Sequence, residues 1–414
     1  MPLRSPDFRL LLLYTSLKRR RRIIDDDDDD VMILQWVECD SHSYLDLSVA
    51  QKQELAFASV IIWDEASMVA DVTADCVNRS LQDILGNRVA FGGMPVVFCG
   101  DFRQLLPVVR GGRGDFHTIQ NCSWWREVVM LKLHYNWRCQ QQAWQSLLDD
   151  VGMGRLEKVA VEACSVRKTV DEVIAHVWPD AASCPTAQRA VLTLTLDDAA
   201  TVNHHVINSL PGESTMVYSC DSYLDCKEPD LYPEEFVRSL SISGVAPGEL
   251  ELKVGARYIV MRNIDQRQGI VNGAQILCTA VTRHHVTGAS CNLLSIMMAH
   301  SLAGTIMYGT YAGSRVMLPR ITFIISPAQS HLPFAVLRRQ FPLIPGFAYS
   351  VHRSQGSTLD VLGIYFGGDA FCHGLLFTAL SRVRGDWTSI AVLSPDSQLC
   401  NCVNRHVLQC LERA

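Results

Sequence analysis

Two short apolar segments, each followed by acidic residues, constrain the fold more than any other feature of the chain. Residues 60–63 are followed directly by Asp64 and Glu65, and residues 96–99 are followed by Gly100 and Asp101. Between them, apolar residues recur at close to a 3.6-residue period, which predicts an amphipathic helix. Strand, helix and strand, with both strands apolar, are typical of a parallel sheet that binds ligands at the carboxyl ends of its strands. Both acidic positions are expected at that edge.

Three further stretches predict how the rest of the chain is divided. A second strand–helix unit covers about residues 190–208, and a last α/β unit runs from Phe347 to the end. Residues 250–281 are typical of β-structure, with Asn272-Gly273 as a hairpin-type turn. The sequence therefore predicts two α/β domains with a small β insertion in the second.

The composition indicates a globular protein and argues against a generally basic nucleic-acid coat protein. Hydrophobic residues make up 48% of the chain, charged residues 19%, and the net charge is −6. Positive charge is nevertheless concentrated late in the chain, since residues 309–384 contain seven Arg, two Asp and no Lys. Such a local excess fits a groove that follows a nucleic-acid strand. The fifteen scattered Cys are typical of reduced thiols in an intracellular protein.

The first forty residues differ from the rest of the chain. A basic run at 18–22 lies close to six consecutive Asp at 25–30. Like-charge blocks repel and stay disordered, so we interpret residues 1–40 as a disordered or spurious leader, with a nuclear import signal as the alternative. No apolar run reaches the ~20 residues that a membrane helix needs.

The residues after the two apolar segments indicate nucleotide chemistry. In nucleotide-hydrolysing sheets, an Asp in the place of Asp64 holds magnesium, and a Glu in the place of Glu65 polarises the attacking water. Gln104 follows the second segment, where it could reach a γ-phosphate and report its presence to a neighbouring domain. Alone, the two carboxylates would be a solvated pair at a strand end and Gln104 an ordinary loop residue.

Several consecutive motifs resemble one helicase family. IIWDEASM resembles motif II and GDFRQLLPVV resembles motif III of the Pif-one-type (petite integration frequency) DNA helicases, in their Helitron-like branch. The resemblance extends from about Gln51 to about Leu393. The other similar stretches, in the order of the family, are LKLHYNWRC, LYPEEFVRSL, LKVGARYIVMRNID, GIVNGAQI, LPRITFIIS, LRRQFPLIPGFAYSVHRSQGSTLD and FCHGLLFTALSRVRG.

The resemblance implies an α/β fold of two RecA-like parallel-sheet lobes, the first incomplete, with a small β-barrel insertion in the second. The implied division, in residue numbers, is a leader at 1–40, the first lobe at 41–165, the second lobe at 166–249 and 343–414, and the inserted β domain at 250–342. ATP and Mg²⁺ would bind between the lobes.

The resemblance also implies roles for individual residues. Asp64 would hold Mg²⁺, Glu65 would act as the base or orient the water, and Gln104 would sense the γ-phosphate. Arg138 and Arg382 would be arginine fingers that reach the nucleotide from the two sides of the cleft.

A late block resembles the motif that couples the nucleotide state to bound DNA. Within VHRSQGSTLD, Gln355 and Gly356 are expected to contact the nucleotide, and His352, Arg353 and Ser354 are expected to contact DNA. His352 alone would be a hydrogen-bonded core histidine. Three aromatic residues are candidates for stacking on bases or for the core: Phe102, Trp137 and Tyr349.

One family motif is absent. The sequence contains no GxxGxGK[ST], the loop whose amides and Lys cradle the phosphates, and none of its seven Lys follows a Gly. The family's Thr-Ala-Ser strand and Gly-rich DNA-contacting segment are absent too. We therefore expect an N-terminally truncated member that lacks the phosphate clamp and a central strand of the first sheet, with ATP binding weakened or lost.

The resulting hypothesis is an ATP-dependent 5′-to-3′ DNA helicase that hydrolyses ATP to move on single-stranded DNA and unwind duplexes. The alternative is a catalytically dead, transposon-derived remnant that binds single strands. Single-stranded or forked DNA is the implied partner, the nucleus is the expected compartment, and the mitochondrion is the alternative. The resemblance suggests DNA repair, recombination, telomere maintenance or rolling-circle transposition as the process.

Overall fold

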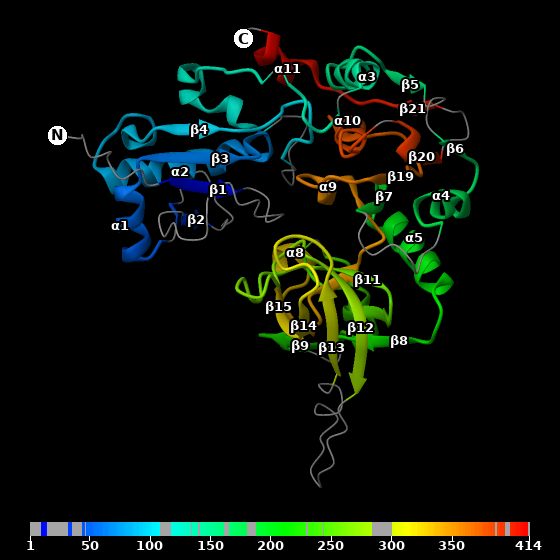
Figure 1. Ribbon diagram of the computed structural model, residues 1–414. Coiled ribbons are helices and arrows are strands. Elements are labelled where there is room, and N and C mark those ends of the chain that lie inside the picture. Colours follow the sequence, from blue (N-terminus) through cyan, green and yellow to red (C-terminus); the bar gives the residue numbers. More distant parts are fainter. Residues whose placement is uncertain are drawn as a thin grey trace, which may run out of the picture.

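The structure of the chain is a computed structural model. It describes residues 10–14, 32–34, 44–45, 47–107, 117–133, 135–139, 141–160, 165–179, 188–228, 231–242, 244–283, 300–385, 387–393 and 398–412. These residues form two α/β lobes, each with a parallel sheet, and an antiparallel β region. Figure 1 shows the antiparallel β region below the second lobe. None of the helices within the described ranges is long and apolar enough to cross a membrane.

The first sheet has four parallel strands in the order β2-β1-β3-β4. Strands β3 (Val60–Asp64) and β4 (Val96–Phe98) are the two apolar segments, and helix α2 (Asp71–Leu85) connects them as the periodicity predicts. The helix ends at Gly86, which takes the left-handed conformation that closes many helices. Its apolar stripe packs on the buried residues of β3, so this unit confirms the predicted strand–helix–strand pattern.

Two strands of the first sheet lie in the expected leader. Strands β1 (Leu10–Tyr14) and β2 (Met32–Leu34) fall within residues 1–40, and β1 pairs with β3 from Leu10–Val60 to Tyr14–Asp64. Strand β3 therefore has a neighbour on both sides, β1 and β4, although we expected a central strand of this sheet to be missing. Short apolar runs on either side of the charge blocks supply this pairing, which shields an edge that would otherwise be exposed. The charge blocks themselves lie outside the described residues.

The second sheet has five strands in the order β18-β7-β19-β20-β6, and every neighbouring pair is parallel. Its strands are β6 (Ser165–Arg167), β7 (Arg189–Thr193), β18 (Ala348–Ser350), β19 (Val361–Tyr365) and β20 (Ile390–Leu393).

Helices cover both faces of the second sheet. One face packs on α4 (Val170–Val177) and α5 (Leu196–Ser209), and the other on α3 (Gln142–Gly152), α9 (Val351–Ser354) and α10 (Leu375–Leu380). Neighbouring residues of one strand face opposite layers, as the alternation of a strand requires. The parallel sheets predicted for the second α/β unit are therefore confirmed.

The lobes exchange two helices relative to the expected boundaries. Helix α3, expected in the first lobe, packs its buried residues Trp144 and Leu148 into the core of the second sheet. Helix α11 (Arg405–Glu412), expected in the second lobe, places Val407 and Leu408 in the core of the first. Amphipathic periodicity shows which face of a helix is buried, but not which sheet it packs against.

The antiparallel region starts at Ser214, earlier than the expected boundary at 250. It contains a two-stranded sheet β10-β8, a three-stranded sheet β15-β16-β9 and a five-stranded sheet β14-β13-β12-β11-β17. The strands are β8 (Ser214–Tyr218), β9 (Cys220–Leu224), β10 (Glu249–Lys253), β11 (Arg257–Val260), β12 (Gln275–Arg283), β13 (His300–Ile306), β14 (Arg315–Leu318), β15 (Ile321–Ile325), β16 (Ala335–Gln340) and β17 (Leu343–Pro345).

The Asn272-Gly273 turn differs from the expected hairpin. It is the last turn of a longer connection between β11 and β12, in which Asn272 donates its backbone N–H to the side chain of Asn263 at 2.9 Å. Gly273 has a φ of 83° and donates its N–H to the carbonyl of Val260 at 2.8 Å. The turn is structural, as predicted, but it is not a two-residue hairpin loop.

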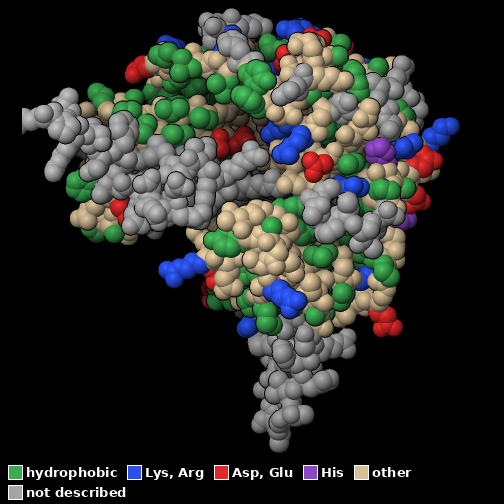
Figure 2. Space-filling view, viewed as in Figure 1, with side chains coloured by type: hydrophobic (Ala, Val, Ile, Leu, Met, Phe, Trp, Pro, Cys, Tyr) green, Lys and Arg blue, Asp and Glu red, His purple; other side chains and the backbone are tan. Residues whose placement is uncertain are grey.

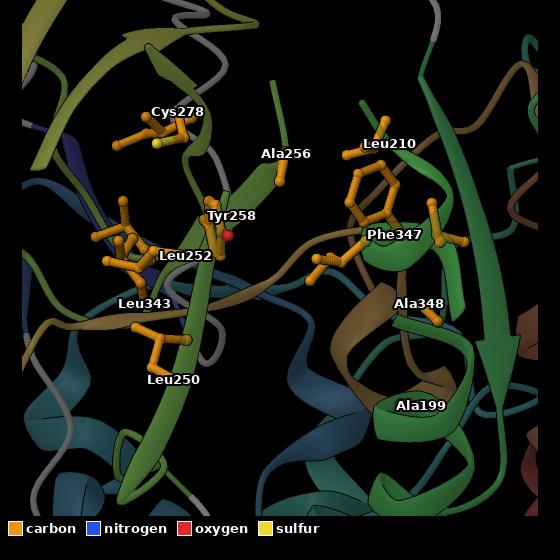
Figure 3. Close-up of a cluster of buried hydrophobic side chains, with 14 of the residues drawn as sticks. Ala199, Leu210, Leu250, Leu252, Ala256, Tyr258, Cys278, Leu343, Phe347 and Ala348 are labelled. Atoms are coloured by element: carbon orange, nitrogen blue, oxygen red, sulfur yellow. The ribbon is translucent and has the colours of Figure 1, made fainter. Parts of the chain in front are cut away.

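A shared apolar core joins the antiparallel region to the second lobe. Figure 3 shows Leu252 and Tyr258 from the β region on one side of this cluster, and Leu210 and Phe347 from the second lobe on the other. Tyr258 is fully buried, and its hydroxyl donates to the carbonyl of Glu251 at 2.8 Å, so its polar end is satisfied within the β region.

Candidate active site

The carboxyl ends of β3 and β4 bring three acidic side chains to one edge of the first sheet. Asp64 ends β3, Glu65 follows it, and Asp101 comes three residues after β4. The two strand ends are joined because Ala66 donates its N–H to the carbonyl of Cys99 at 2.8 Å. At the neighbouring Gly100, a Cβ atom would come within 2.9 Å of the backbone nitrogen of Ser67, so a side chain does not fit there.

Glu65 is held in an unusual backbone conformation. Its φ of 53° is left-handed, which costs a non-glycine residue about 1–2 kcal/mol. This conformation turns the chain from β3 into the short 3₁₀ helix Ala66–Met68. The sheet and the adjoining loop therefore fix the direction of the Glu65 carboxylate.

Two carboxyl groups of the acidic cluster have raised pKa values. Burial raises the pKa of Asp64. Burial also raises the pKa of Glu65, with further upward contributions from Asp64 and Asp101, while Arg382 and Arg138 oppose the shift. A desolvated carboxylate with a raised pKa is suited to accept a proton or to face a divalent cation.

Arg382 lies deep in the cleft between the lobes. It follows α10 and is 1% exposed. Its Nη2 donates to Oε1 of Gln104 at 3.2 Å, and its Nε donates to the carbonyl of Thr378 at 2.9 Å. Burial and the like charge of Arg138 lower its pKa to about 10, against the opposing pull of Glu65 and the other anionic groups around it. The structure thus brings Gln104 of the first lobe and Arg382 of the second into contact.

Arg138 approaches the same place from the segment before α3. Its Nη1 donates to the carbonyl of Ser381 at 2.9 Å, next to Arg382. Two guanidinium groups close together repel unless an anion lies between or beside them. Figure 2 shows acidic side chains in the hollow between the lobes, with basic side chains across from them.

The loop that carries Gln104 is docked on the second lobe. Arg103 forms ion pairs with Asp101 at 2.9 Å and with Asp149 of α3 at 2.7 Å, and its guanidinium lies 4.9 Å from the ring centre of Phe377. Leu105 donates its N–H to the hydroxyl of Thr378 at 3.1 Å. The sequence pattern indicated Asp101 but no role for Arg103. The only sequence signal for Arg103 is its position next to Gln104.

The block around α9 combines buried polar atoms with one residue that is clearly structural. Gln355 is 1% exposed, and neither its Oε1 nor its Nε2 has a hydrogen-bond partner among the described residues. The same holds for Nε2 of His352 and Nη1 of Arg353. Ser354, by contrast, is fully buried, and its hydroxyl donates to the carbonyl of Val351 at 2.6 Å, so it is not placed to contact DNA.

The buried atoms of this block fit a bound ligand. A buried polar group without a partner costs about 1–3 kcal/mol, and a phosphate or sugar oxygen would remove that cost. Burial lowers the pKa of His352, which keeps the imidazole neutral, and it also lowers the pKa of Arg353. Gly356 follows with a φ of 71°, where the left-handed backbone favours glycine.

The aromatic candidates divide between core and surface. Phe102 and Tyr349 are buried in the cores of the first and second lobes, so neither presents a face to a base. Trp137 is 82% exposed and packs edge-on against Tyr135, with ring centres 4.5 Å apart.

The Arg-rich stretch 309–384 does not form one exposed groove. Arg338 is fully buried, paired with Asp221 at 3.0 Å, and Arg382 is buried in the cleft. Arg315, Arg339 and Arg384 are exposed. The local excess of Arg is therefore in part structural.

The cluster also fits a magnesium–nucleotide. Mg²⁺ in nucleotide sites is held by one or two carboxylates together with phosphate oxygens and water. Asp64 and Glu65 can supply the carboxylates. No group of three or more His, Cys, Asp or Glu side chains in the described parts of the chain could hold a metal by itself. The residues thus suit a cation that arrives with its phosphates.

Two stretches of the chain match models of known protein families. Residues 37–160 match the family model of PIF1-like helicases, and residues 235–281 match that of the 2B domain of the DNA helicase Pif1. The chain is 29% identical over 349 residues to the ATP-dependent DNA helicase PIF1 of the mouse, and 29% identical over 346 residues to the human protein. Each match covers 83% of this chain and 47% of the relative, so the chain spans about half the length of these relatives.

Solved structures show the same fold. The structure of two Pif1 helicases that coordinate at forked duplex DNA has a TM-score of 0.65 at 18% identity, covering 99% of this chain and 87% of that one. The Bacteroides Pif1 helicase in complex with ADP-AlF₃ and single-stranded DNA has a TM-score of 0.62 at 18% identity, covering 99% and 88%. The stretch that matches the model of PIF1-like helicases carries the acidic cluster and Gln104, so in this stretch and in its fold the chain is similar to the PIF1-like helicases.

Proposed function

We propose that the chain is the motor part of an ATP-dependent 5′-to-3′ DNA helicase, with ATP bound between the two lobes. One observation carries the proposal: Arg382 of the second lobe is buried against Gln104, and its charge acts on Glu65. A cleft that combines desolvated carboxylates with an arginine from the other lobe suits the transfer of a phosphoryl group to water. The mouse and human relatives are named ATP-dependent DNA helicases.

The acidic residues have separate roles in this proposal. Asp64 would hold Mg²⁺, which neutralises charge on the phosphate oxygens when it is bound. Glu65 would polarise the attacking water, and the raised pKa of its carboxyl group fits a proton acceptor. The strained backbone at Glu65 supports this role, because such strain tends to be kept where it orients a functional group.

The polar residues of the cleft would read the state of the nucleotide. Arg138 and Arg382 would stabilise negative charge that develops on the phosphates, and Gln104 would sense the γ-phosphate. Because Gln104 and Arg382 come from different lobes, a change at the phosphate would alter their contact and move one lobe against the other. This motion would advance the DNA.

The α9 block would connect the cleft to the DNA. Gln355 and Gly356 would contact the nucleotide, and the unpartnered buried atoms of Gln355 support this. His352 and Arg353 would contact a phosphate of the strand. The Bacteroides relative was solved with single-stranded DNA, which supports the same partner here.

Single-strand binding without hydrolysis is a second candidate. It is favoured by the absence of GxxGxGK[ST] from the 414 residues, since the amides and Lys of that loop hold the β- and γ-phosphates. The two candidates share the DNA-binding surface and differ in the chemistry of the cleft.

DNA-stimulated ATP hydrolysis decides between the candidates. We expect phosphate release that rises with added oligo-dT and that falls to background in Glu65→Gln. Glu127→Gln, an exposed change in the same lobe, is the matched control and should keep full activity. If oligo-dT binds with normal affinity but ATP is not hydrolysed, the helicase proposal fails for this chain and the second candidate replaces it.

Three finer assignments remain predictions from the motifs. They are the Helitron-like branch of the family, a role in repair, recombination, telomere maintenance or transposition, and a nuclear location. The basic run at residues 18–22 supports nuclear import, and fluorescence microscopy of the tagged chain with and without that run would test it.

A further inference from the structure

His373 lies where three distant segments meet. It precedes α10, is 4% exposed, and its Nε2 lies 2.7 Å from the carbonyl oxygen of Phe102. Its Nδ1 lies 2.8 Å from the backbone nitrogen of Asn404. A backbone N–H only donates, so Nδ1 must accept and Nε2 must carry the proton that is donated to Phe102. The imidazole is therefore neutral, in one tautomer, with both nitrogens used.

Phe102 belongs to the loop that presents Gln104. Next to His373, a Cβ atom at Gly374 would come within 2.5 Å of the carbonyl oxygen of Arg103, so the loop backbone lies directly against this turn. Two residues beyond Phe102, the side chain of Gln104 accepts from Arg382. A shift of the Phe102 carbonyl would thus carry the Gln104 side chain with it.

Asn404 belongs to a C-terminal segment that contacts both lobes. Near its start, the side chain of Asn401 donates to the carbonyls of Val151 and Leu156 at 2.9 Å each, on the second-lobe side. Three residues beyond Asn404, the backbone oxygen of Val407 accepts from the side chain of Gln120 at 3.1 Å in the first lobe. We name residues 401–408 the C-terminal segment.

We propose that His373 is a positioning residue that holds the Gln104 loop and the C-terminal segment in one arrangement. Its neutral ring fixes the Phe102 carbonyl on one side and the Asn404 amide on the other. Gln104 is thereby kept opposite Arg382, where the proposed function places the γ-phosphate. The effect on ATP hydrolysis rests on that function, whereas the effect on the loop and the C-terminal segment does not.

Amide hydrogen exchange tests the positioning role without any activity. A leucine side chain has no polar atom, so His373→Leu would leave the Phe102 carbonyl and the Asn404 amide without partners. Exchange should then rise about ten-fold in peptides that cover 101–106 and 401–408. Peptides from β7, β19 and β20 should be unchanged. His373→Gln, which keeps a donor and an acceptor, should stay close to the wild type.

A second variant separates the two hydrogen bonds and covers the case in which His373→Leu does not fold. His373→Asn carries its polar atoms only as far as the position of Nδ1, so it can keep Asn404 and must lose Phe102. Exchange should then rise in 101–106 but not in 401–408. An equal rise in the sheet peptides, or a rise confined to residues 370–376, would overturn the proposal.

Kinetics with ATP and oligo-dT test the link to Gln104. His373→Leu should lower kcat about ten-fold with little change in the KM for ATP, and His373→Gln should restore most of it. In a Gln104→Ala background the His373 change should cause no further loss, because both changes act through one side chain. Independent, multiplicative losses would overturn the coupling. If the wild type hydrolyses no ATP, the proposed function fails, and the exchange experiment still decides the role of His373.

Discussion

The two parallel sheets of this protein differ in how well their apolar residues are covered. In the second lobe, the central strands β7 and β19 are packed by helices on both faces. In the first lobe, Val97 in the middle of β4 is 47% exposed, and three apolar side chains among residues 129–133 face solvent: Val129 at 81%, Leu131 at 87% and Leu133 at 99%. Asp64 and Glu65, for which catalytic roles are proposed, thus lie at the end of a strand in the less covered sheet.

The difference shows that the first lobe depends on contacts with the second for its order. Its own core is smaller, and the loop with Gln104 is fixed by Asp149 and Thr378, which both belong to the second lobe's layers. An apolar residue that stays in water adds almost nothing to the free energy of unfolding. Stability and chemistry are therefore distributed unequally between the lobes.

The largest effect is expected where the second lobe supplies charge to the first. Arg382→Ala should lower the rate of DNA-stimulated ATP hydrolysis by about a thousand-fold or more, because an arginine finger stabilises the transition state to that extent. Steady-state phosphate release measures the rate, and binding of labelled oligo-dT should be little changed. Arg384→Ala, two residues away on the surface, is the control. Equal losses in both variants would contradict a specific role for Arg382.

Core substitutions should show the next largest effect and a clear asymmetry between the sheets. Leu362→Ala in β19 removes a fully buried side chain and should lower the free energy of unfolding by about 2–5 kcal/mol. Val97→Ala in β4 should change it by at most about 1 kcal/mol, since its side chain is half in water already. Urea unfolding followed by tryptophan fluorescence measures both. Similar costs at the two positions would remove the basis of the comparison.

The pH dependence of the free energy of unfolding should show that the ionised Glu65 carboxylate destabilises the folded first lobe. The folded pKa of Glu65 lies above the ordinary value of 4.5, so its contribution to stability is complete below pH 4.5 and is lost as the pH rises through the folded pKa. Glu65→Gln removes this loss. The free energy of unfolding of the variant, measured relative to the wild type, should therefore increase from pH 4.5 towards neutrality. A difference that stays constant with pH would contradict the raised pKa.

The smallest effect is expected on the exposed apolar segment. Leu133→Ser should leave the free energy of unfolding within about 0.5 kcal/mol of the wild type, because the side chain is almost wholly in water. It should also reduce the binding of the dye ANS, which reports exposed apolar surface. Leu192→Ser, at a fully buried position of β7, is the contrasting variant and should unfold the second lobe.

The sequence predicted what local patterns determine. The apolar strands were correctly placed within one residue, because runs of four apolar residues are too short for a typical helix and end at polar residues or glycine. The predicted lobe boundaries assigned α3 and α11 to the wrong sheets, since the apolar face of a helix can pack on either lobe. The position of Gln104 beside Arg382 followed only from the order of the motifs, and no pattern near His373 indicated its two hydrogen bonds.

Arg338 shows why counting charges did not define the DNA surface. In β16 the side chains of Arg338 and Arg339 point to opposite faces, as strand geometry requires. Arg338 consequently lies inside with Asp221, and Arg339 lies outside. The two residues are identical in composition and adjacent in the chain, so only the register of the strand separates a structural ion pair from a surface charge.

The exchange of α3 and α11 has a mechanical consequence. The chain passes from the first lobe to the second before α3 and returns to the first lobe before α11, so two separate tethers join the lobes. A rigid body attached to another at two points keeps one easy rotation, about the line through both attachments. Opening of the cleft would then follow one fixed path, and every cycle would bring Arg382 back to the same side chain.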